Sequence, residues 1–428
     1  MIRFTWGTKL SVLSLSGQLL SYVLGIVLAR RLGVGGFESY VVASAAFILM
    51  VTVVPQGLEK YSLKLLPPLL ERGETGLLRG FLRFSIQRIL LGSALLGTAV
   101  ALWAWQAEGL SAEMRTAILI SCLSLPAGAL VHLGLELLTA FGRAWQAALV
   151  FRLAVPATAL LLVLAMLASM EGMHAPWAIG AWGLSWCLAL ALMARQVSRS
   201  APANLFDVPA IERRSEWRSE AMPFWIYRIS IAVLAQAGVL VLEAVQTSAS
   251  AVGAFAVAMS TAAIARVLVN STNRVYASRL SLLLERGDMD GIAELRRQRL
   301  RWLAFPVSAY LLLVSIYASE LLALFRPEFV HDGAPALRVL AVATAISTLL
   351  ALAPTYLKHQ GSNSVLFSQV AIAAVLQMAL LAVLAPRFGS VGAAVAYAVA
   401  STFMYASLAW RAHLGLRRSR PRPPPDEH

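Results

Sequence analysis

Several polar side chains recur at helical spacing inside segments that are otherwise apolar. Arg266, Asn270 and Asn273 are four and three residues apart, so they share one face of a helix. Gln236 and Glu243 are seven residues apart and share a face in the same way. A guanidinium group binds phosphate, an amide binds hydroxyl groups, and a carboxylate binds a cation or a proton. Both faces are therefore candidates for lining a polar passage.

The first apolar segment carries another polar face, made by Ser11, Ser14, Gln18, Ser21 and Gly25. Alternating spacings of three and four residues keep all five on one side of a helix. Two interpretations of this face remain open. Either it lines a polar cleft, or it is a seam at which small residues let two helices approach closely.

The charged residues of these segments each have a structural alternative. Arg266 lies six residues from the end of its segment, so its side chain could extend to the lipid headgroups instead. Arg228 also lies near the end of its segment, and Glu243 either binds a coupling ion or caps a helix end in headgroup water. Glu136 and Arg152, near the ends of adjacent segments, predict a structural ion pair.

The composition shows what kind of element must position these residues. Of 428 residues, 59% are hydrophobic and 14% are charged, whereas soluble proteins average about 45–50% and about 25%. These values exclude an ordinary soluble domain and a disordered chain. The apolar residues suffice for roughly a dozen membrane spans of about 20 residues. Cys122 and Cys187 provide neither a disulfide framework nor a metal-binding spacing, so we expect no metal and no cofactor.

The apolar segments predict an all-α integral membrane protein with about twelve transmembrane helices. Short connections join the segments on the outer side of the membrane, so no outer domain is expected. The predicted segments are 9–30, 38–58, 84–106, 114–138, 146–169, 175–196, 222–245, 250–272, 302–325, 333–357, 364–385 and 389–411.

The basic residues predict the orientation of these helices. The chain has 36 Lys and Arg against 22 Asp and Glu, a net charge of +14. Most of the basic residues fall in connections on the side of the N-terminus, which the positive-inside rule makes the cytoplasmic side. We therefore expect both termini in the cytoplasm, and we attribute the excess charge to topology rather than to nucleic-acid binding. Arg30, Arg31, Arg115, Arg326 and Arg387 fall on the outer side.

The chain resembles itself at half its length. The sequence LLERGE at 69–74 recurs as LLERGD at 283–288, between the second and third apolar segments of each half. Six segments per half place both halves in the membrane in the same sense, an arrangement found in secondary transporters. We therefore predict two six-helix repeats. The predicted division is a first half at 1–198, a cytoplasmic linker at 199–220, a second half at 221–413 and a disordered tail at 414–428.

Several short motifs resemble those of a known family. They are LARRLG at 28–33, followed by Phe37 and Tyr40, then VGAF at 252–255 and LAPRFGSVGAA at 384–394. Together they are similar to the polysaccharide-transporter branch of the multidrug/oligosaccharidyl-lipid/polysaccharide flippase superfamily, which includes O-antigen flippases. The chain departs from the pattern at Glu38, where the family usually has Gly, and at Gln377, where it usually has Asn.

The resemblance implies a function. Such proteins are flippases that move an undecaprenyl-diphosphate-linked oligosaccharide across the bacterial inner membrane by alternating access, for surface polysaccharides such as the O-antigen of lipopolysaccharide. They hydrolyse no nucleotide, and the sequence has no G-x-x-x-x-G-K-[ST] phosphate loop. The implied partners are the lipid-linked oligosaccharide, membrane lipids and glycan-assembly proteins, with no nucleic acid. The resemblance does not imply an enzyme.

With this resemblance, the polar faces predict a substrate site between the halves, where cations hold the diphosphate and amides contact polar groups. Arg30 matches an Arg of the family, and it either anchors to outer headgroups or meets the diphosphate at the outer mouth. The predicted substrate ligands are Arg266, Arg30, Arg228, Gln18, Gln236 and Asn270, and the candidate for ion coupling is Glu243.

Three other functions are weighed against this one. A multidrug or small-molecule exporter of the same superfamily would normally have a more acidic cleft with fewer arginines. A membrane enzyme of glycan assembly, such as a polymerase or ligase, usually needs a large outer loop for its catalytic residues, and the sequence has none. A membrane scaffold without transport activity would not need two matching halves.

Overall fold

The fold consists of helices and the short connections between them. The computed structural model describes residues 2–169, 172–205, 207–245 and 247–418, and at 2–9, 11, 266–275, 278 and 415–418 it describes the backbone alone. None of the described residues forms a strand. In a bilayer every backbone N–H and C=O must be bonded within the protein, and a helix achieves this within one segment. The predicted all-α membrane fold is confirmed.

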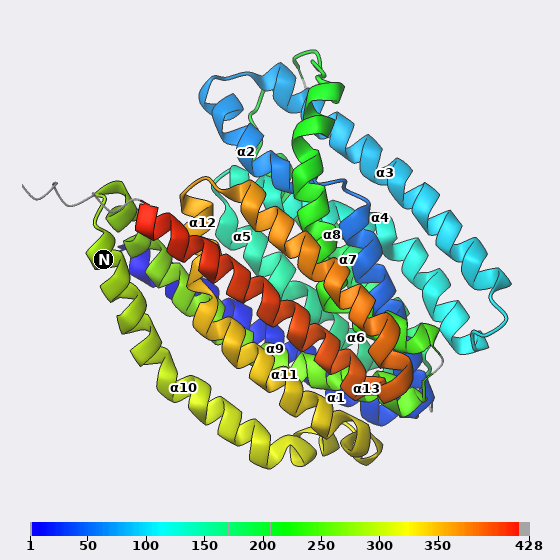
Figure 1. Ribbon diagram of the computed structural model, residues 1–428. Coiled ribbons are helices and arrows are strands. Elements are labelled where there is room, and N and C mark those ends of the chain that lie inside the picture. The colour runs from blue at the N-terminus through cyan, green and yellow to red at the C-terminus, as the bar shows by residue number, and fades with distance from the viewer. Residues whose placement is uncertain (1, 170–171, 206, 246, 419–428) are drawn as a thin grey trace, which may run out of the picture.

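The first half of the chain forms one bundle of helices (Figure 1). Glycines with positive φ follow the ends of α2 and α4, at Gly73 and Gly142, and Gly57, also with positive φ, stands directly before α2. The helices are α1 (Ile2–Val53), α2 (Leu58–Glu71), α3 (Thr75–Gln106), α4 (Ala112–Ala140), α5 (Ala144–Leu149), the π-helical turn η1 (Val150–Ala154), α6 (Val155–Ser169) and α7 (Ala175–Ser200).

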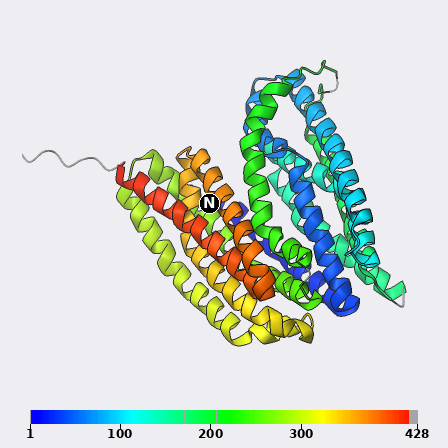
Figure 2. The ribbon, with the colours of Figure 1, turned by 45° about the vertical axis from the view of Figure 1, so that its right-hand side comes forward.

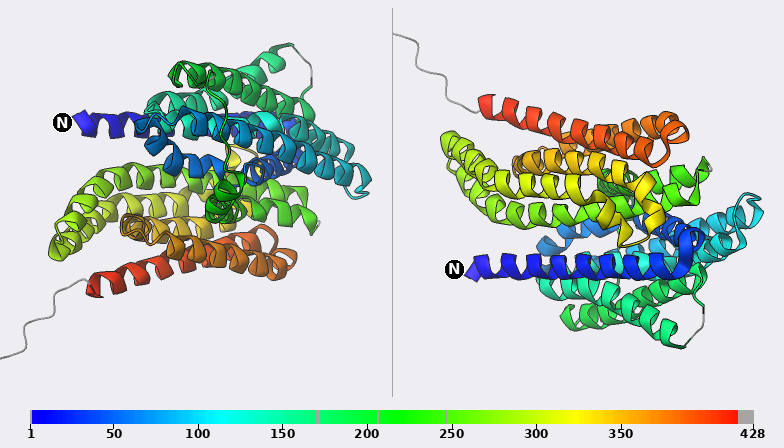
Figure 3. Two further views of the ribbon diagram at one scale, coloured as in Figure 1. Left: turned by 90° about the horizontal axis from the view of Figure 1, so that it is seen from above. Right: turned by 90° about the horizontal axis from the view of Figure 1, so that it is seen from below.

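The second half forms the other bundle, which begins after the connection 201–213. Figure 2 shows the two bundles close together at one end and diverging toward the other, with the green helix that begins the second half in contact with both. Figure 3 shows them as two adjacent layers. The helices are α8 (Arg214–Ala244), α9 (Ala249–Glu285), α10 (Met289–Ala323), the 3-10 turn η2 (Pro327–Phe329), α11 (Val330–Leu350), α12 (Leu352–His359) and α13 (Asn363–Arg418).

Two of the longest helices are hairpins that reverse at a single glycine. Non-helical backbone occurs inside α1 at Gly33, with φ 75°, and inside α13 at Gly389, with φ 52°. The arms of α13 pack so closely that a Cβ on Gly392 would lie 2.1 Å from the carbonyl oxygen of Leu384. We call the membrane side with Gly33 and Gly389 the hairpin side. The opposite side, where α1 begins and α13 ends, is the terminal side.

The number of crossing segments agrees with the sequence. Nine of the described helices are long and apolar enough to cross a membrane. Two of them, Val12–Glu71 and Asn363–Leu414, contain the reversals at Gly33 and Gly389, and α9 adds the shorter apolar segment Ala249–Ala265. Counting both arms of each hairpin together with α9, the described chain has the twelve crossing segments that the sequence predicts.

The repeated sequence adopts the same turn in both halves. LLERGE at 69–74 ends α2, and LLERGD at 283–288 ends α9. Gly73 has φ 67° and Gly287 has φ 68°. The backbone N–H of Glu74 donates to the oxygen of Leu69 at 2.9 Å, and that of Asp288 donates to Leu283 at 3.0 Å. The motif is therefore a helix stop, repeated at the same point of each half.

Candidate functional site between the halves

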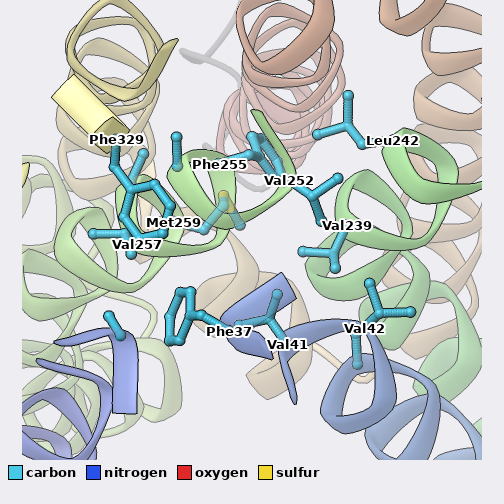
Figure 4. Packing of buried hydrophobic residues seen from close by; sticks show 14 of the residues in the cluster. Phe37, Val41, Val42, Val239, Leu242, Val252, Phe255, Val257, Met259 and Phe329 are labelled. Carbon is cyan, nitrogen blue, oxygen red and sulfur yellow. The ribbon is translucent and has the colours of Figure 1, made fainter. Parts of the chain in front are cut away.

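The two halves meet at the hairpin side through a large apolar contact. Phe37 and Val41 of α1 face Phe255 of α9 and Phe329 of η2 in Figure 4, and all four are buried. The rings of Phe37 and Phe329 are 5.6 Å apart. Near them, Tyr22 packs edge-on against Phe325 at 5.0 Å. The close packing of these side chains supplies van der Waals attraction between the halves at their hairpin ends.

Two arginines add reciprocal polar contacts beside this apolar surface. Arg30 of the first half donates from Nε to the carbonyl oxygen of Leu324 at 2.8 Å. Arg326 of the second half donates from a terminal nitrogen to the carbonyl oxygen of Ala29 at 3.3 Å. Arg326 also binds Glu328 at 2.8 Å. Each half therefore contributes a guanidinium group to the contact between the hairpin ends of the two halves. We call this contact region the hairpin-side mouth.

The sequence singled out Arg30 but not Arg326 as a site residue. Arg30 stood out because it broke the positive-inside pattern and matched a family motif. Arg326 also breaks the positive-inside pattern, but no family motif marks it. Its acceptor is a backbone oxygen nearly three hundred residues away, and a backbone acceptor leaves no mark in the sequence.

The polar face of the first helix serves different contacts along its length. Ser14 accepts from Arg152 at 2.9 Å, and a Cβ on Gly17 would lie 1.8 Å from the backbone oxygen of Arg152. This end of the face packs within the first half. A Cβ on Gly25 would lie 3.2 Å from the ring of Phe325 in the second half. The end of the polar face near Gly25 therefore packs against the second half at the hairpin side. Between them Gln18 is half-buried and Ser21 is exposed.

Arg228 lies in a buried cluster of charges between α8 and the first half. Its Nε is 3.3 Å from Oε1 of Glu59, a carboxylate whose side chain is only 2% exposed. A terminal nitrogen of Arg228 is 3.4 Å from Nδ1 of His132. Lys60 pairs with Glu136 in the same region. The predicted pair between Glu136 and Arg152 was therefore wrong, because α2 brings Lys60 to the carboxylate instead.

Glu243 meets a second carboxyl group at the hairpin end of α8. Its side chain interacts with Glu38 of α1, in the other half. Glu38 is the residue that stands where the resembled family has Gly. Glu243 also lines an otherwise apolar cavity of about 500 Å³ between α1, α3, α4 and α8. Gln236, two turns earlier on the same helix, is half-buried.

All of the predicted substrate ligands, and Glu243 as the ion-coupling group, stay predictions. Arg266, Asn270 and Asn273 lie on α9 in a stretch where the structure describes the backbone alone. The predictions for their side chains therefore lie outside what the structure describes. Among the residues whose side chains are described, no group of three His, Cys, Asp or Glu is placed to hold a metal ion. Cys122 and Cys187 are both free thiols.

Comparison with known proteins identifies the class of fold. The chain is similar to an inward-facing multidrug resistance MATE family transporter of the MOP superfamily, with a TM-score of 0.75 and 12% identity over 96% of this chain and 98% of that one. It is similar to the lipid II flippase MurJ in an inward closed conformation, with a TM-score of 0.72 and 12% identity over 96% and 88%. These neighbours are transporters and flippases.

A third solved structure has a similar fold. It is a MOP superfamily transporter from Pyrococcus furiosus, with a TM-score of 0.67 and 11% identity over 98% of this chain and 97% of that one. No protein-family model matches the sequence. No curated protein sequence matches it either. The chain therefore has the fold of the MOP superfamily transporters, a multi-pass membrane architecture, and the similarity extends over nearly its whole length.

Proposed function

We propose that this protein is a flippase of the bacterial inner membrane that moves an undecaprenyl-diphosphate-linked oligosaccharide to the outer leaflet for surface polysaccharide synthesis. The terminal side would face the cytoplasm, as the basic residues of the sequence indicate. The fold is shared with a lipid II flippase, and the short motifs at 28–33 and 384–394 resemble those of polysaccharide transporters.

The pair of guanidinium groups at the hairpin-side mouth is the observation that carries this proposal. Arg30 and Arg326 each bind a carbonyl oxygen of the opposite half. Alternating access requires the halves to separate here, which breaks both bonds and exposes both cations. A guanidinium group binds a phosphate more strongly than it binds a neutral carbonyl oxygen. The open mouth would therefore present two cations to an anionic headgroup as it leaves.

The chain needs no covalent chemistry for this activity. The halves would bind the headgroup from the terminal side, close around it and reopen at the hairpin side, while the polyprenyl chain stays in lipid. Glu243 and Glu38 would supply the carboxyl groups for coupling to a proton or another cation, since they face each other across the halves. Arg266 and Asn270 of α9 would contribute ligands within the passage.

A flipping assay with matched arginine variants tests the proposal. Cells that depend on this protein would carry Arg30→Gln or, as a control, Arg31→Gln, which alters an adjacent exposed arginine. We expect Arg30→Gln to lower export of the lipid-linked oligosaccharide about tenfold, the effect of losing one charge-assisted hydrogen bond. The control should stay within about twofold of wild type. Normal export by Arg30→Gln in stably inserted protein would refute the role of the mouth.

One observation favours a second candidate, an exporter of cationic drugs. The carboxyl group of Glu243 lies on the wall of an apolar cavity of about 500 Å³, and this combination suits an amphipathic cation. Resistance of an overexpressing strain to cationic dyes, lost in Glu243→Gln, would support this reading. Unchanged resistance together with export of the lipid-linked oligosaccharide would support the flippase.

A further inference from the structure

A groove of about 710 Å³ lies between α8 and α13 on the terminal side, away from the hairpin-side mouth. Both helices begin on the terminal side and run in the same direction, so residues early in each helix lie at the membrane surface. None of its residues belongs to the contacts already described at the mouth. The groove is lined by Ser215, Arg218, Ser219, Met222, Pro223 and Ile226 of α8 and by Ser364, Phe367, Ser368 and Ala371 of α13.

The lining changes from polar to apolar along the groove. The first turns of the two helices contribute hydroxyl groups, from Ser215 on α8 and Ser364 on α13. One turn deeper lie Arg218 and Ser219, and beyond them the wall is apolar, beginning with Met222. A helix rises about 1.5 Å per residue, so this change occurs over roughly 10 Å. The groove thus matches a molecule with a polar head and an apolar tail.

Arg218 is the cation of the groove, and it differs from its neighbours. Arg213 pairs with Glu216 at 3.5 Å, and Arg214 pairs with Glu212. Among the described residues, Arg218 has no acidic partner within 4.0 Å. Its guanidinium group is exposed at the groove. The unpaired N–H groups of two helix N-termini lie on the same side and also favour an anion.

The deep part of the groove combines packed aromatic rings with exposed aliphatic side chains. Phe367 packs against Phe224 at 5.6 Å and against Tyr227 at 4.8 Å, which joins the two helices behind the groove. Met222 is 43% exposed and Ile226 is 47% exposed. An alkyl chain lying along these residues would make van der Waals contact with their exposed apolar side chains.

We propose that this groove is the lateral entrance at which the carrier first binds its lipid-linked substrate. The polyprenyl chain lies along Met222, Ile226 and Ala371. The diphosphate meets Arg218 and the Ser219 hydroxyl, and the sugar reaches Ser364 at the surface. This order, from apolar tail through phosphate to sugar, is the order of groups in a polyprenyl-diphosphate sugar. The inference rests on the proposed function, because it assigns that substrate to a second place on the chain.

A binding experiment with the full chain tests the entrance directly. The protein is placed in nanodiscs of phosphatidylcholine and titrated with undecaprenyl-diphosphate N-acetylglucosamine, and the bound lipid is counted by native mass spectrometry. Arg218→Gln should weaken binding about tenfold, since it removes a charge-assisted hydrogen bond to phosphate. Arg214→Gln, four residues away and ion-paired with Glu212, is the matched control and should change binding less than about twofold.

A second pair of variants tests the groove by filling it. Ser368→Trp places a large ring in the groove without changing charge, and it should abolish binding. Val375→Trp places the same ring at a position on α13 that is 70% exposed and outside the groove lining, so it should leave binding unchanged. Normal binding in both Arg218→Gln and Ser368→Trp would overturn the entrance.

Two further outcomes separate the groove from the function. Displacement of the probe by an equal concentration of phosphatidylglycerol would mean that the groove takes bulk anionic lipid, and it would overturn the assignment to substrate. If wild type flips the lipid-linked sugar while every groove variant binds it normally, only the entrance is lost. If wild type neither binds nor flips it, the proposed function is lost as well.

Discussion

The buried ion pair between α2 and α8 gives a stability prediction whose size follows from its surroundings. Glu59 is 2% exposed in its side chain and sits 3.3 Å from Arg228, which is 21% exposed. Neither oxygen of Glu59 has a hydrogen-bond partner among the described residues, so Arg228 is its main compensation. Removing one member of a buried pair costs about 3–5 kcal/mol, because the other charge is left uncompensated.

We expect Glu59→Gln to lower the free energy of unfolding by about 3 kcal/mol, the low end of that range, because Arg228 keeps partial access to solvent. Unfolding in mixed micelles with increasing sodium dodecyl sulfate, followed by tryptophan fluorescence, measures this change. Replacing both charges, with Glu59→Gln and Arg228→Met together, should recover most of the loss, since no buried charge then remains unpaired.

An exposed pair at the same interface serves as the control. Lys64 and Glu220 are 64% and 46% exposed, and their ion pair also joins α2 to α8. Lys64→Gln should change the unfolding free energy by less than about 1 kcal/mol, because solvent screens an exposed pair. If the double variant at Glu59 and Arg228 loses as much as the sum of the two single variants, the two residues are independent and the reasoning is refuted.

Two further substitutions probe the contacts that α8 makes near α2. Gly57→Ala should destabilise the protein by about 3 kcal/mol, because its φ is 77° and a Cβ would lie 2.4 Å from the Ala221 oxygen. Gly142→Ala, with the same φ and open space around it, should cost only about 1 kcal/mol, and equal losses would contradict this account. Trp225→Phe should cost about 1 kcal/mol by removing the 2.8 Å bond from the indole N–H to Val53, and an unchanged unfolding midpoint would show that the bond contributes nothing.

Much of the architecture could be predicted because the bilayer restricts what a sequence can do. Apolar segments of sufficient length must be helices, and their number and order follow from reading the chain once. The helix stop at 69–74 and 283–288 was visible as a repeat, since a left-handed glycine is required at the same place in each half. The predicted end of the second segment, at 58, was less accurate, because a further helix, α2, continues the chain from Leu58 to Glu71.

The contacts between the halves could not be predicted in the same way. Glu59 gives no signal in the sequence, because it stands beside Lys60, where a charge usually belongs to a solvated connection, and its partner is 169 residues away. Arg30 and Arg326 bind backbone oxygens, whose position depends on packing and not on residue type. The groove was hidden for another reason, since part of its lining, including Arg218, falls in the segment 199–220 that the sequence assigned to a linker.

The reversal of the chain at single glycines limits the surface that other proteins can contact on the hairpin side. At Gly33 and Gly389 two helices turn back without any intervening loop. These two reversals therefore present no exposed loop that an antibody or a docking protein could bind or a protease could cleave. The longest connection, at 201–213, emerges on the opposite side. A partner protein that docks outside the membrane would accordingly contact the terminal side.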